Sequence, residues 1–281
     1  MVNDVDLGKL ATQVRRDALR MVYAAQSGHP GGAMGCVEYF LALYFGVMKH
    51  EPSRFALDGR DEDVFILSNG HICAAWYSVL ARSGYFPIEE LGTFRKIGSR
   101  LQGHPSPAKG LPGVRVATGS LGQGLSVACG FALGKKLAQD PRRVYVLMGD
   151  GETQEGQVWE AAMFAAHHRL DNLVAAIDLN YKQIDGDVPK VMGVDPVAEK
   201  WTAFGWDARV VESGNDLGAV TAALQAAEAQ DGRPKMLVLR TVMGKGVDFM
   251  ENDYRWHGKA PNDAQFEAAI AQLPRQYEEF L

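Results

Sequence analysis

Two oxygen-bearing side chains stand where two apolar runs end, and their types suit a hard cation. Asp150 lies in Gly149-Asp150-Gly151, directly after the apolar run 144–148, and Asn180 closely follows the run 173–177. Mg²⁺ prefers oxygen ligands and usually combines one or two protein groups with the phosphates of a ligand. Glycines beside the carboxylate would let the backbone approach such a phosphate closely. The pattern therefore predicts a site for a magnesium diphosphate.

The elements around these residues explain how the two side chains would meet. Residues 157–169 carry alanine and valine at helical spacing, so the region predicts a strand, a helix and a returning strand. Such units bind ligands at the carboxyl ends of their parallel strands, where Asp150 and Asn180 would converge. Further strands are expected at 64–67, 208–211 and 236–242, and further helices at 34–48, around 77–80, and at 125–137, 217–229 and 263–273. We expect an α/β fold, a doubly wound, mostly parallel sheet flanked by helices, with residues 1–281 as a single domain.

The two ends of the chain carry weaker signals. Leu7, Leu10, Val14 and Met21 mark an amphipathic first helix, which Gly28 could end. At the other end, the tail RQYEEFL is expected to fray.

Four of the seven histidines lie next to glycine or proline in loops expected at the same crevice. They are His29, His71, His104 and His257. A single loop histidine is more often a surface or structural residue, but four together favour a functional set. Imidazole donates or accepts protons near neutral pH, so these side chains could bind the hydroxyls of a sugar and exchange protons with it.

A glycine-rich segment, residues 118–124, precedes the predicted helix 125–137. Its glycines could direct backbone N–H groups and a helix amino terminus toward an anion, or could permit close helix packing, and the glycines alone leave both interpretations open. Glu155 stands where a helix is expected to start, and a carboxylate there is favourable because of the helix dipole.

Composition limits the class of protein. With 281 residues, 47% of them hydrophobic, the chain can bury a large core. A net charge of −5 without a basic stripe argues against nucleic acid as a partner. Its three cysteines lack CxxC spacing, so packing in a reducing cytoplasm is the expected role. We find no export leader and no apolar run that could span a bilayer, and we expect a soluble protein without a membrane partner.

With these residues in view, the chain resembles the amino-terminal half of a transketolase. GDG followed some 30 residues later by Asn is the thiamine diphosphate (ThDP) signature of that family, although its common Asn-Asn ending is Leu179-Asn180 here. The resemblance also rests on SGHPGGAMG, LSNGH, GHPS, LPGVRVATGSLGQGLSVACG and HGKAP, which occur in family order. We therefore expect the fold of a ThDP pyrophosphate-binding domain.

The resemblance assigns roles to these residues. It implies that Asp150, Asn180 and the carbonyl of Lys182 hold Mg²⁺ or Ca²⁺, and that Gly149 and Gly151 lie against the cofactor. By the same resemblance, Gly119 contacts the cofactor phosphate and Leu121 the thiazolium ring.

The resemblance implies different roles for two pairs of histidines. His29 and His257 would handle the carbonyl and hydroxyl protons, while His71 and His104 would contact the cofactor and the transferred two-carbon unit. Glu155 would belong to a proton network that crosses the subunit interface.

Full-length transketolases continue through a pyrimidine-binding domain and a third domain, and the resemblance covers only the first. In the family, the glutamate that activates the cofactor lies on the pyrimidine-binding domain of another subunit. The resemblance therefore implies a partner chain, the C-terminal transketolase subunit, in an α2β2 complex, and little activity from this chain alone.

The implied reaction is transfer of a two-carbon ketol unit from a ketose to an aldose. Donors would be sugar phosphates of the pentose phosphate pathway such as xylulose 5-phosphate, or unusual phosphorylated or sulfonated sugars. Two alternatives remain open: the α subunit of a 2-oxo acid dehydrogenase, which the four-histidine set disfavours, and a noncatalytic ThDP-binding protein.

Overall fold

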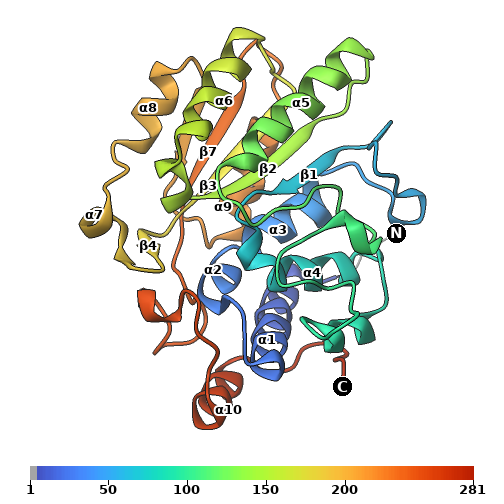
Figure 1. Ribbon diagram of the computed structural model, residues 1–281, viewed down its shortest axis with the longest axis vertical. Helices are drawn as coiled ribbons and strands as arrows, with labels where there is room; N and C mark the ends of the chain where they lie inside the picture. Colours follow the sequence, from blue (N-terminus) through green and yellow to red (C-terminus); the bar gives the residue numbers. More distant parts are fainter. Residues whose placement is uncertain (1–4) are drawn as a thin grey trace.

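Five parallel strands form the central sheet of the computed structural model, which describes residues 5–281 (Figure 1). In the order β1-β2-β3-β7-β6, the strands are β1 (Val64–Leu67), β2 (Val144–Gly149), β3 (Leu173–Leu179), β7 (Lys235–Arg240) and β6 (Asp207–Val211). Neighbouring strands all run parallel. Except in the edge strand β6, almost all strand residues are buried. This is expected for parallel strands that have helices on both faces.

Helices cover both faces of this sheet, and the direction of the chain decides which face each one takes. One face packs on α5 (Gln123–Leu137), α6 (Gly156–His167) and α8 (Val197–Ala203). The other packs on α3 (Val37–Ala42), α4 (Cys73–Arg82) and α9 (Leu217–Ala226), and α1 (Leu7–Ala25) packs against α3 and α4. From β6 the chain turns back toward β7, so a right-handed crossover places α9 on the face opposite to α6. The expected doubly wound fold is confirmed.

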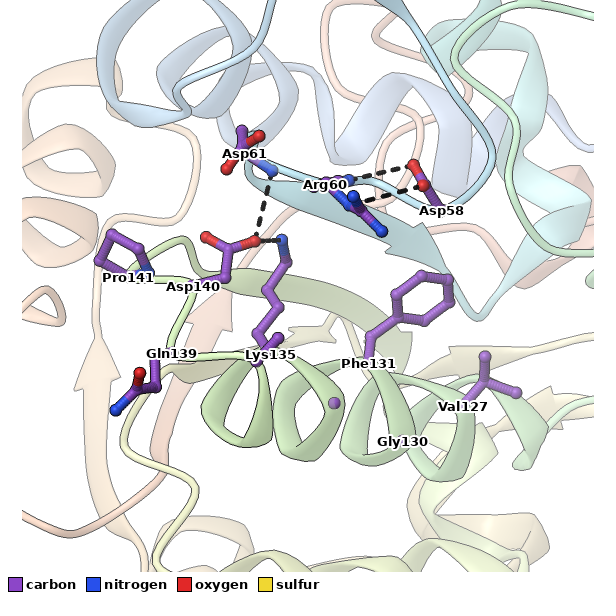
Figure 2. A pocket seen from close by; sticks show the side chains of 12 residues that line it. Asp58, Arg60, Asp61, Val127, Gly130, Phe131, Lys135, Gln139, Asp140 and Pro141 are labelled. Carbon is purple, nitrogen blue, oxygen red and sulfur yellow. Dashed lines mark hydrogen bonds and ion pairs between the residues drawn. The ribbon is translucent and has the colours of Figure 1, made fainter.

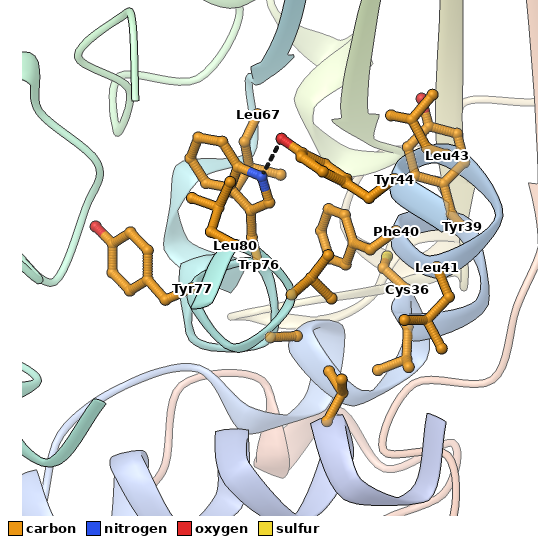
Figure 3. Close-up of a cluster of buried hydrophobic side chains, with 14 of the residues drawn as sticks. Cys36, Tyr39, Phe40, Leu41, Leu43, Tyr44, Leu67, Trp76, Tyr77 and Leu80 are labelled. Atoms are coloured by element: carbon orange, nitrogen blue, oxygen red, sulfur yellow. Dashed lines mark hydrogen bonds between the residues drawn. The ribbon is translucent and has the colours of Figure 1, made fainter. Parts of the chain in front are cut away.

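An aromatic cluster joins the helices on the second face (Figure 3). Phe65 of β1 lies edge-on to Trp76 of α4 at 5.5 Å between ring centroids, and the indole Nε1 of Trp76 donates to the hydroxyl of Tyr44 at 2.7 Å. Ring pairs of this kind add to the burial energy of the core. The cluster fixes α4 against β1, and so fixes the loop between them.

Smaller elements complete the fold. They are α2 (Pro30–Gly35), a π-helical turn (Leu43–Val47), the antiparallel pair β4 (Lys182–Gln183) and β5 (Gly186–Asp187), α7 (Val188–Val191) and α10 (Asp263–Gln272). Short 3₁₀ helices occupy Pro52–Arg54, Gly70–Ile72, Ile88–Thr93, Pro107–Lys109, Gly151–Gln154 and Tyr254–Trp256.

The prediction of one helix over residues 34–48 is wrong. The chain instead forms α2, α3 and the π-helical turn, with a break at Cys36. A β-carbon on Gly31 would lie 2.9 Å from the carbonyl oxygen of Trp256, and one on Gly35 would lie 3.1 Å from that of Val242. These glycines let α2 approach the segment after β7, a contact that sequence periodicity does not reveal.

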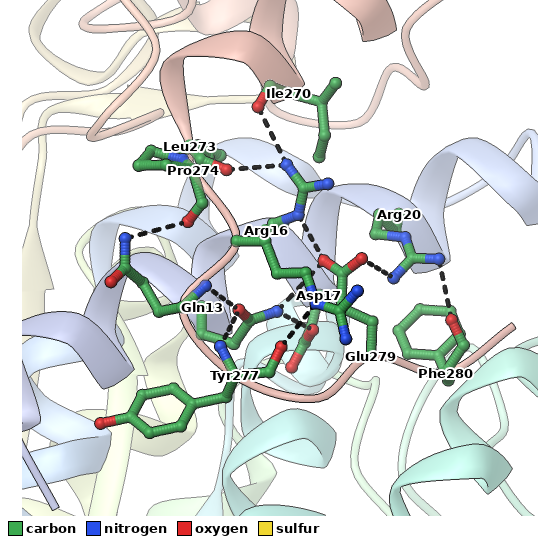
Figure 4. A network of polar contacts seen from close by, with 12 residues as sticks. Gln13, Arg16, Asp17, Arg20, Ile270, Leu273, Pro274, Tyr277, Glu279 and Phe280 are labelled. Carbon is green, nitrogen blue, oxygen red and sulfur yellow. Dashed lines mark hydrogen bonds and ion pairs between the residues drawn. The ribbon is translucent and has the colours of Figure 1, made fainter.

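Both ends of the chain also differ from expectation. The first helix ends at Ala25, and Gln26 rather than Gly28 takes the left-handed conformation after it, with φ of 45°. The tail does not fray: Glu279 pairs with Arg16 and Arg20, and Phe280 is 4% exposed (Figure 4). Other expected elements are present, and their ends agree with expectation to within three residues.

The structure also bears on two expectations from composition. Cys36, Cys73 and Cys129 are buried and unpaired, which fits a packing role. Among residues 5–281, no helix has the length and apolar character needed to cross a bilayer. The expectation that the chain carries no export leader rests partly on residues 1–4, which lie outside the described residues.

Candidate active site

A cavity of about 410 Å³ lies at the carboxyl ends of the strands. The loop after β1 contributes Asn69, the loop after β2 contributes Asp150, and the segment after β3 contributes Asn180. All twelve residues that the sequence singled out line this cavity: His29, His71, His104, Gly119, Leu121, Gly149, Asp150, Gly151, Glu155, Asn180, Lys182 and His257. The tertiary structure thus gathers residues that are up to 228 positions apart, from His29 to His257.

Of the three buried carboxylates that line the cavity, Asp150 and Asp178 form a pair whose charges interact. Asp150 is 2% exposed and accepts hydrogen bonds from the backbone N–H groups of Gly151 at 2.7 Å and Tyr181 at 2.5 Å. Burial, reinforced by the charge of Asp178, raises the pKa of Asp150 to about 8. Such a carboxylate would gain stability from a nearby cation, since a metal ion reverses this effect of burial.

Asn180 presents its amide in one orientation. Its Nδ2 donates to Asp178 Oδ2 at 2.7 Å, and its Oδ1 accepts the backbone N–H of Lys182 at 2.8 Å. Because a carboxylate only accepts, the nitrogen must face Asp178, which leaves the oxygen for other partners. The Lys182 ammonium is engaged elsewhere, with Asp187 at 2.6 Å.

The donors available to a cation are of mixed type. Within the part of the chain that the structure describes, no three His, Cys, Asp or Glu side chains are grouped to hold a metal ion. Asp150, the amide oxygen of Asn180 and the carbonyl of Lys182 are all hard oxygen donors of the kind that would hold Mg²⁺ or Ca²⁺, with phosphate oxygens and water as the remaining ligands. The residues present therefore fit a hard cation.

The four predicted histidines form one cluster. The ring centroid of His29 lies 5.0 Å from that of His71, 6.1 Å from that of His104 and 5.8 Å from that of His257, and His71 and His257 are 5.0 Å apart. Sequence adjacency to glycine or proline had suggested that these rings share a crevice, and the structure confirms it.

Burial keeps this cluster uncharged. It lowers the pKa of His29 to about 4, with further lowering from His257 and Arg95, and it lowers the pKa of His71 well below the usual value. Burial also lowers the pKa of His104 and His257. At neutral pH each ring therefore offers one N–H donor and one acceptor nitrogen. Within residues 5–281, the buried Nδ1 atoms of His29 and His257 have no hydrogen-bond partner, so they are free for a polar ligand.

The glycine-rich segment uses its backbone groups inside the protein. Gly122, with φ of 84°, is the residue before the first turn of α5, and its N–H donates to the buried carboxylate of Glu152 at 2.8 Å. The N–H of Gly124 donates to Ser68 Oγ at 3.1 Å. The anion at this helix terminus is therefore an internal side chain. Of the two interpretations that the glycines left open, Gly122 fits N–H groups directed at an anion, and Gly124 fits close packing. Gly119 and Leu121 do line the cavity.

Glu155 lies at the rim of the cavity. It is exposed, precedes the first turn of α6 and makes no side-chain capping hydrogen bond. Its position fits the favourable charge at a helix start that the sequence suggested.

Several lining residues escaped the sequence interpretation. They are Gly32, Asn69, Glu152, Gln154, Asp178, Gln183 and Ile184. Asp178 had a usable signal, since a carboxylate inside an otherwise apolar strand must have a specific partner. Asn69 lies within the LSNGH motif, and its buried Oδ1 is without a partner among the described residues.

A second cavity, of about 800 Å³, is larger but has a different character (Figure 2). It runs along α5 beside Gly130 and Phe131, and it reaches Asp61 and Asp140, which precede β1 and β2. It therefore lies at the amino ends of these strands and contains none of the histidines. Chemistry rather than size favours the smaller cavity as the active site, because ligands of parallel sheets bind at the carboxyl ends of the strands.

The comparisons with known proteins agree with this geometry. Residues 8–280 match the family described as the transketolase, thiamine diphosphate binding domain. The chain belongs to the transketolase family. It corresponds to the amino-terminal subunit of a two-chain transketolase and binds thiamine diphosphate.

Individual relatives show how much of a transketolase the chain represents. A 6-deoxy-6-sulfo-D-fructose transketolase subunit from a Clostridium species is 39% identical, with 97% of this chain and 98% of that protein aligned. An apulose-4-phosphate transketolase subunit from Phocaeicola vulgatus is 38% identical over 94% of this chain and 92% of that protein. Transketolase from Leishmania mexicana superposes with a TM-score of 0.88 at 32% identity, covering 96% of this chain but 41% of that one. This chain thus spans about two fifths of that solved transketolase.

Proposed function

We propose that this chain is the cofactor-binding half of an enzyme that transfers a two-carbon ketol unit from a ketose to an aldose. One observation carries the proposal: four neutral histidines and the Asp150 and Asn180 oxygens line one cavity at the carboxyl ends of the sheet. The proposed reaction requires both sets of residues. A polyhydroxylated sugar needs many hydrogen-bonding groups, and the diphosphate of the cofactor needs a cation.

The cation would rest on Asp150, Asn180 and the carbonyl of Lys182, with Mg²⁺ as its identity. The buried carboxylate pair supports this assignment, because the raised pKa of Asp150 reflects a negative charge that the protein alone compensates poorly. When bound, thiamine diphosphate supplies the electron sink for cleavage of the ketose C2–C3 bond.

The histidines would bind and orient the sugar. Their neutral rings supply N–H donors and acceptor nitrogens without placing cations in the cavity. We assign His29 and His257 to the carbonyl and hydroxyl oxygens of the substrate, because the Nδ1 atom of each is buried and unpartnered among the described residues. There they would hold or move a proton as the bond breaks and forms.

The partner would complete the site from the open side. Relatives of matching length are named as subunits, which supports a second chain that carries the remaining transketolase domains. Residues 1–281 would then be a single pyrophosphate-binding domain in an α2β2 complex, and the exposed Glu155 at the cavity rim would meet the partner chain. The buried, unpaired cysteines support a reducing cytoplasm as the location.

The relatives indicate candidate donor sugars. The relatives named for 6-deoxy-6-sulfo-D-fructose and for apulose 4-phosphate share more of their length with this chain than the full-length transketolases do. We therefore place these anionic sugars beside xylulose 5-phosphate as candidate donors.

The test is reconstitution. This chain would be co-expressed with the product of its neighbouring gene, supplied with ThDP and Mg²⁺, and given each donor in turn with ribose 5-phosphate as acceptor. We expect a ketose product two carbons longer than the acceptor from the pair and none from either chain alone. The Asp150→Ala pair serves as the inactive control.

The outcomes separate the alternatives. Release of CO₂ from a 2-oxo acid, with no ketol transfer, would indicate a 2-oxo acid dehydrogenase. A chain that binds ThDP but forms no complex and turns over no sugar would indicate a noncatalytic binding protein. Robust turnover by this chain alone would contradict the two-chain proposal.

A further inference from the structure

One buried carboxylate at the active site has no part in the mechanism above. Glu152 follows Asp150 by two residues, lies in the 3₁₀ turn Gly151–Gln154 and is 1% exposed. It accepts hydrogen bonds from the hydroxyl of Ser68, from the N–H of Gly122 at 2.8 Å and from the N–H of Gly149 at 3.1 Å. These donors come from three segments that are far apart in the sequence.

Each of the three segments carries a predicted site residue. The loop after β1 holds Ser68 and His71, the segment before α5 holds Gly119 and Gly122, and the loop after β2 holds Gly149 and Asp150. A single side chain therefore connects the histidine, glycine-rich and metal-binding segments of the cavity.

A second layer of contacts makes the arrangement rigid. Ser68 Oγ, while donating to Glu152, accepts the N–H of Gly124 at 3.1 Å. A β-carbon on Gly124 would lie 2.3 Å from Ser68 Oγ, so only glycine fits there without movement. Burial raises the pKa of Glu152, and its hydrogen bonds from Ser68, Gly122 and Gly149 oppose that rise.

The electrostatic consequence concerns the amino terminus of α5. A helix start attracts anions because its first N–H groups are unpaired and its dipole is positive there. At this helix start, the carboxylate of Glu152 accepts the N–H of Gly122. A side chain of the protein itself therefore supplies the anion there. Cofactor phosphate would then be held at Gly149-Asp150-Gly151, on loops whose spacing Glu152 sets.

We propose that Glu152 is the positioning residue of the cofactor site, which holds the three segments at the separation that thiamine diphosphate binding requires. The inference rests on the proposed function, since it concerns the same cofactor. Glu152 acts through the backbone at Gly122 and Gly149, not by contact with the sugar.

The test uses Glu152→Gln, which keeps the size of the side chain. A glutamine amide must direct its NH₂ group at either the Gly122 or the Gly149 N–H, and two donors cannot pair. Glu160→Gln is the matched control, because Glu160 is an exposed residue of α6. Hydrogen exchange would be measured on the full chain without ligand, and ThDP titrations at fixed Mg²⁺ on the two-chain enzyme.

We expect the Gly122 and Gly149 amides of Glu152→Gln to exchange about tenfold faster or more, since local opening would cost less. The affinity for ThDP should fall about tenfold or more, which corresponds to about 1.4 kcal/mol. At saturating ThDP, the KM for the sugar should stay within about twofold of the parent value, because no substrate contact is lost. A general loss of folding would not produce this separation.

Other outcomes are equally informative. Unchanged amide protection and unchanged ThDP affinity in Glu152→Gln would overturn the proposal. Failure of the parent enzyme to bind ThDP would instead refute the proposed function, while the exchange experiment would still report on the loop connection. If Glu152→Gln does not fold, Ser68→Ala removes one donor without changing charge, and the proposal then requires weaker ThDP binding with an unchanged sugar KM.

Discussion

At the residue scale, the cavity combines carboxylates that burial makes hard to ionise with histidines that burial keeps neutral. The two effects have the same physical cause, since transfer from water to a less polar site disfavours whichever form is charged. They have opposite consequences for binding. Asp150 would gain stability from a cation, whereas neutral histidines suit the uncharged hydroxyls of the proposed sugar.

Asp150→Ala should abolish Mg²⁺-dependent ThDP binding. The change removes the only carboxylate among the three proposed metal ligands, so we expect the affinity to fall about 100-fold or more. Calorimetric titration of ThDP at fixed Mg²⁺ measures it, with the exposed, nearby Asp185→Ala as control. Equal affinity in the parent and Asp150→Ala proteins would refute the metal assignment.

His29 should make stability depend on pH. Its pKa of about 4 in the folded chain lies below the unfolded value of 6.5, so below pH 6.5 the unfolded chain binds a proton that the native state does not. The free energy of unfolding should therefore decrease as the pH falls from about 6.5 to about 4. The contribution of His29 is at most roughly 3.4 kcal/mol, because one pKa unit corresponds to about 1.36 kcal/mol.

Urea denaturation across this pH range compares the parent chain with His29→Asn. The variant lacks the titrating group, so its stability should fall less steeply on acidification, and the two curves should run parallel above about pH 7. Parallel curves at every pH would show that His29 titrates normally in the folded chain.

At the scale of elements, the C-terminal tail acts as a strap on α1 (Figure 4). Glu279 pairs with Arg16 and with Arg20, the latter at 2.9 Å, and Gln13 accepts the backbone N–H of Tyr277 at 2.9 Å. The Arg20 guanidinium also stacks on Phe280, 4.6 Å from the ring centroid. Because α1 packs on α4, the strap supports the layer that carries the histidine loops.

Glu279→Ala should destabilise the chain by about 2 kcal/mol, since it leaves two half-buried guanidinium groups without their carboxylate. Glu278→Ala is a close control, because its side chain is exposed and its backbone carbonyl, which the substitution keeps, accepts a hydrogen bond from Arg82. We expect the control to change stability by less than about 0.5 kcal/mol. Urea denaturation measures the free energy of unfolding of both variants. Similar losses in the two would show that the ion pairs of Glu279 do not account for the loss.

At the scale of the whole molecule, two cavities lie at opposite ends of one parallel sheet. The carboxyl ends of the strands gather the loops of β1, β2 and β3, while the larger cavity along α5 lies at the amino ends (Figures 1 and 2). The polarity of the sheet therefore supports the smaller cavity as the proposed active site.

Arg60→Ala tests this assignment. Arg60 lines the larger cavity, and its side chain is 79% exposed, so its loss should leave the fold intact. We expect the affinity for ThDP to stay within about twofold of the parent value, because surface changes far from a site rarely affect it. A marked loss of ThDP binding would show that the larger cavity takes part in holding the cofactor.

The sequence by itself determined the parts of this protein that depend on local pattern. Apolar runs and helical spacing predicted the strands and most helices. The oxygen-bearing residues after two of the runs indicated Asp150 and Asn180, and loop positions next to glycine or proline indicated the four histidines. Short-range periodicity is enough for these features, because burial of one face is what selects a strand or a helix.

Only the tertiary structure decided which groups are already engaged. The close approach of α2 to the carbonyls of Val242 and Trp256 depends on the distant segment after β7, and the docking of Glu279 depends on α1. Glu152 likewise takes its role from Ser68 and Gly122, which lie 84 and 30 residues away in the sequence. These contacts arise when the chain packs, and no local pattern encodes them, because a buried polar group is satisfied by whatever the fold brings to it.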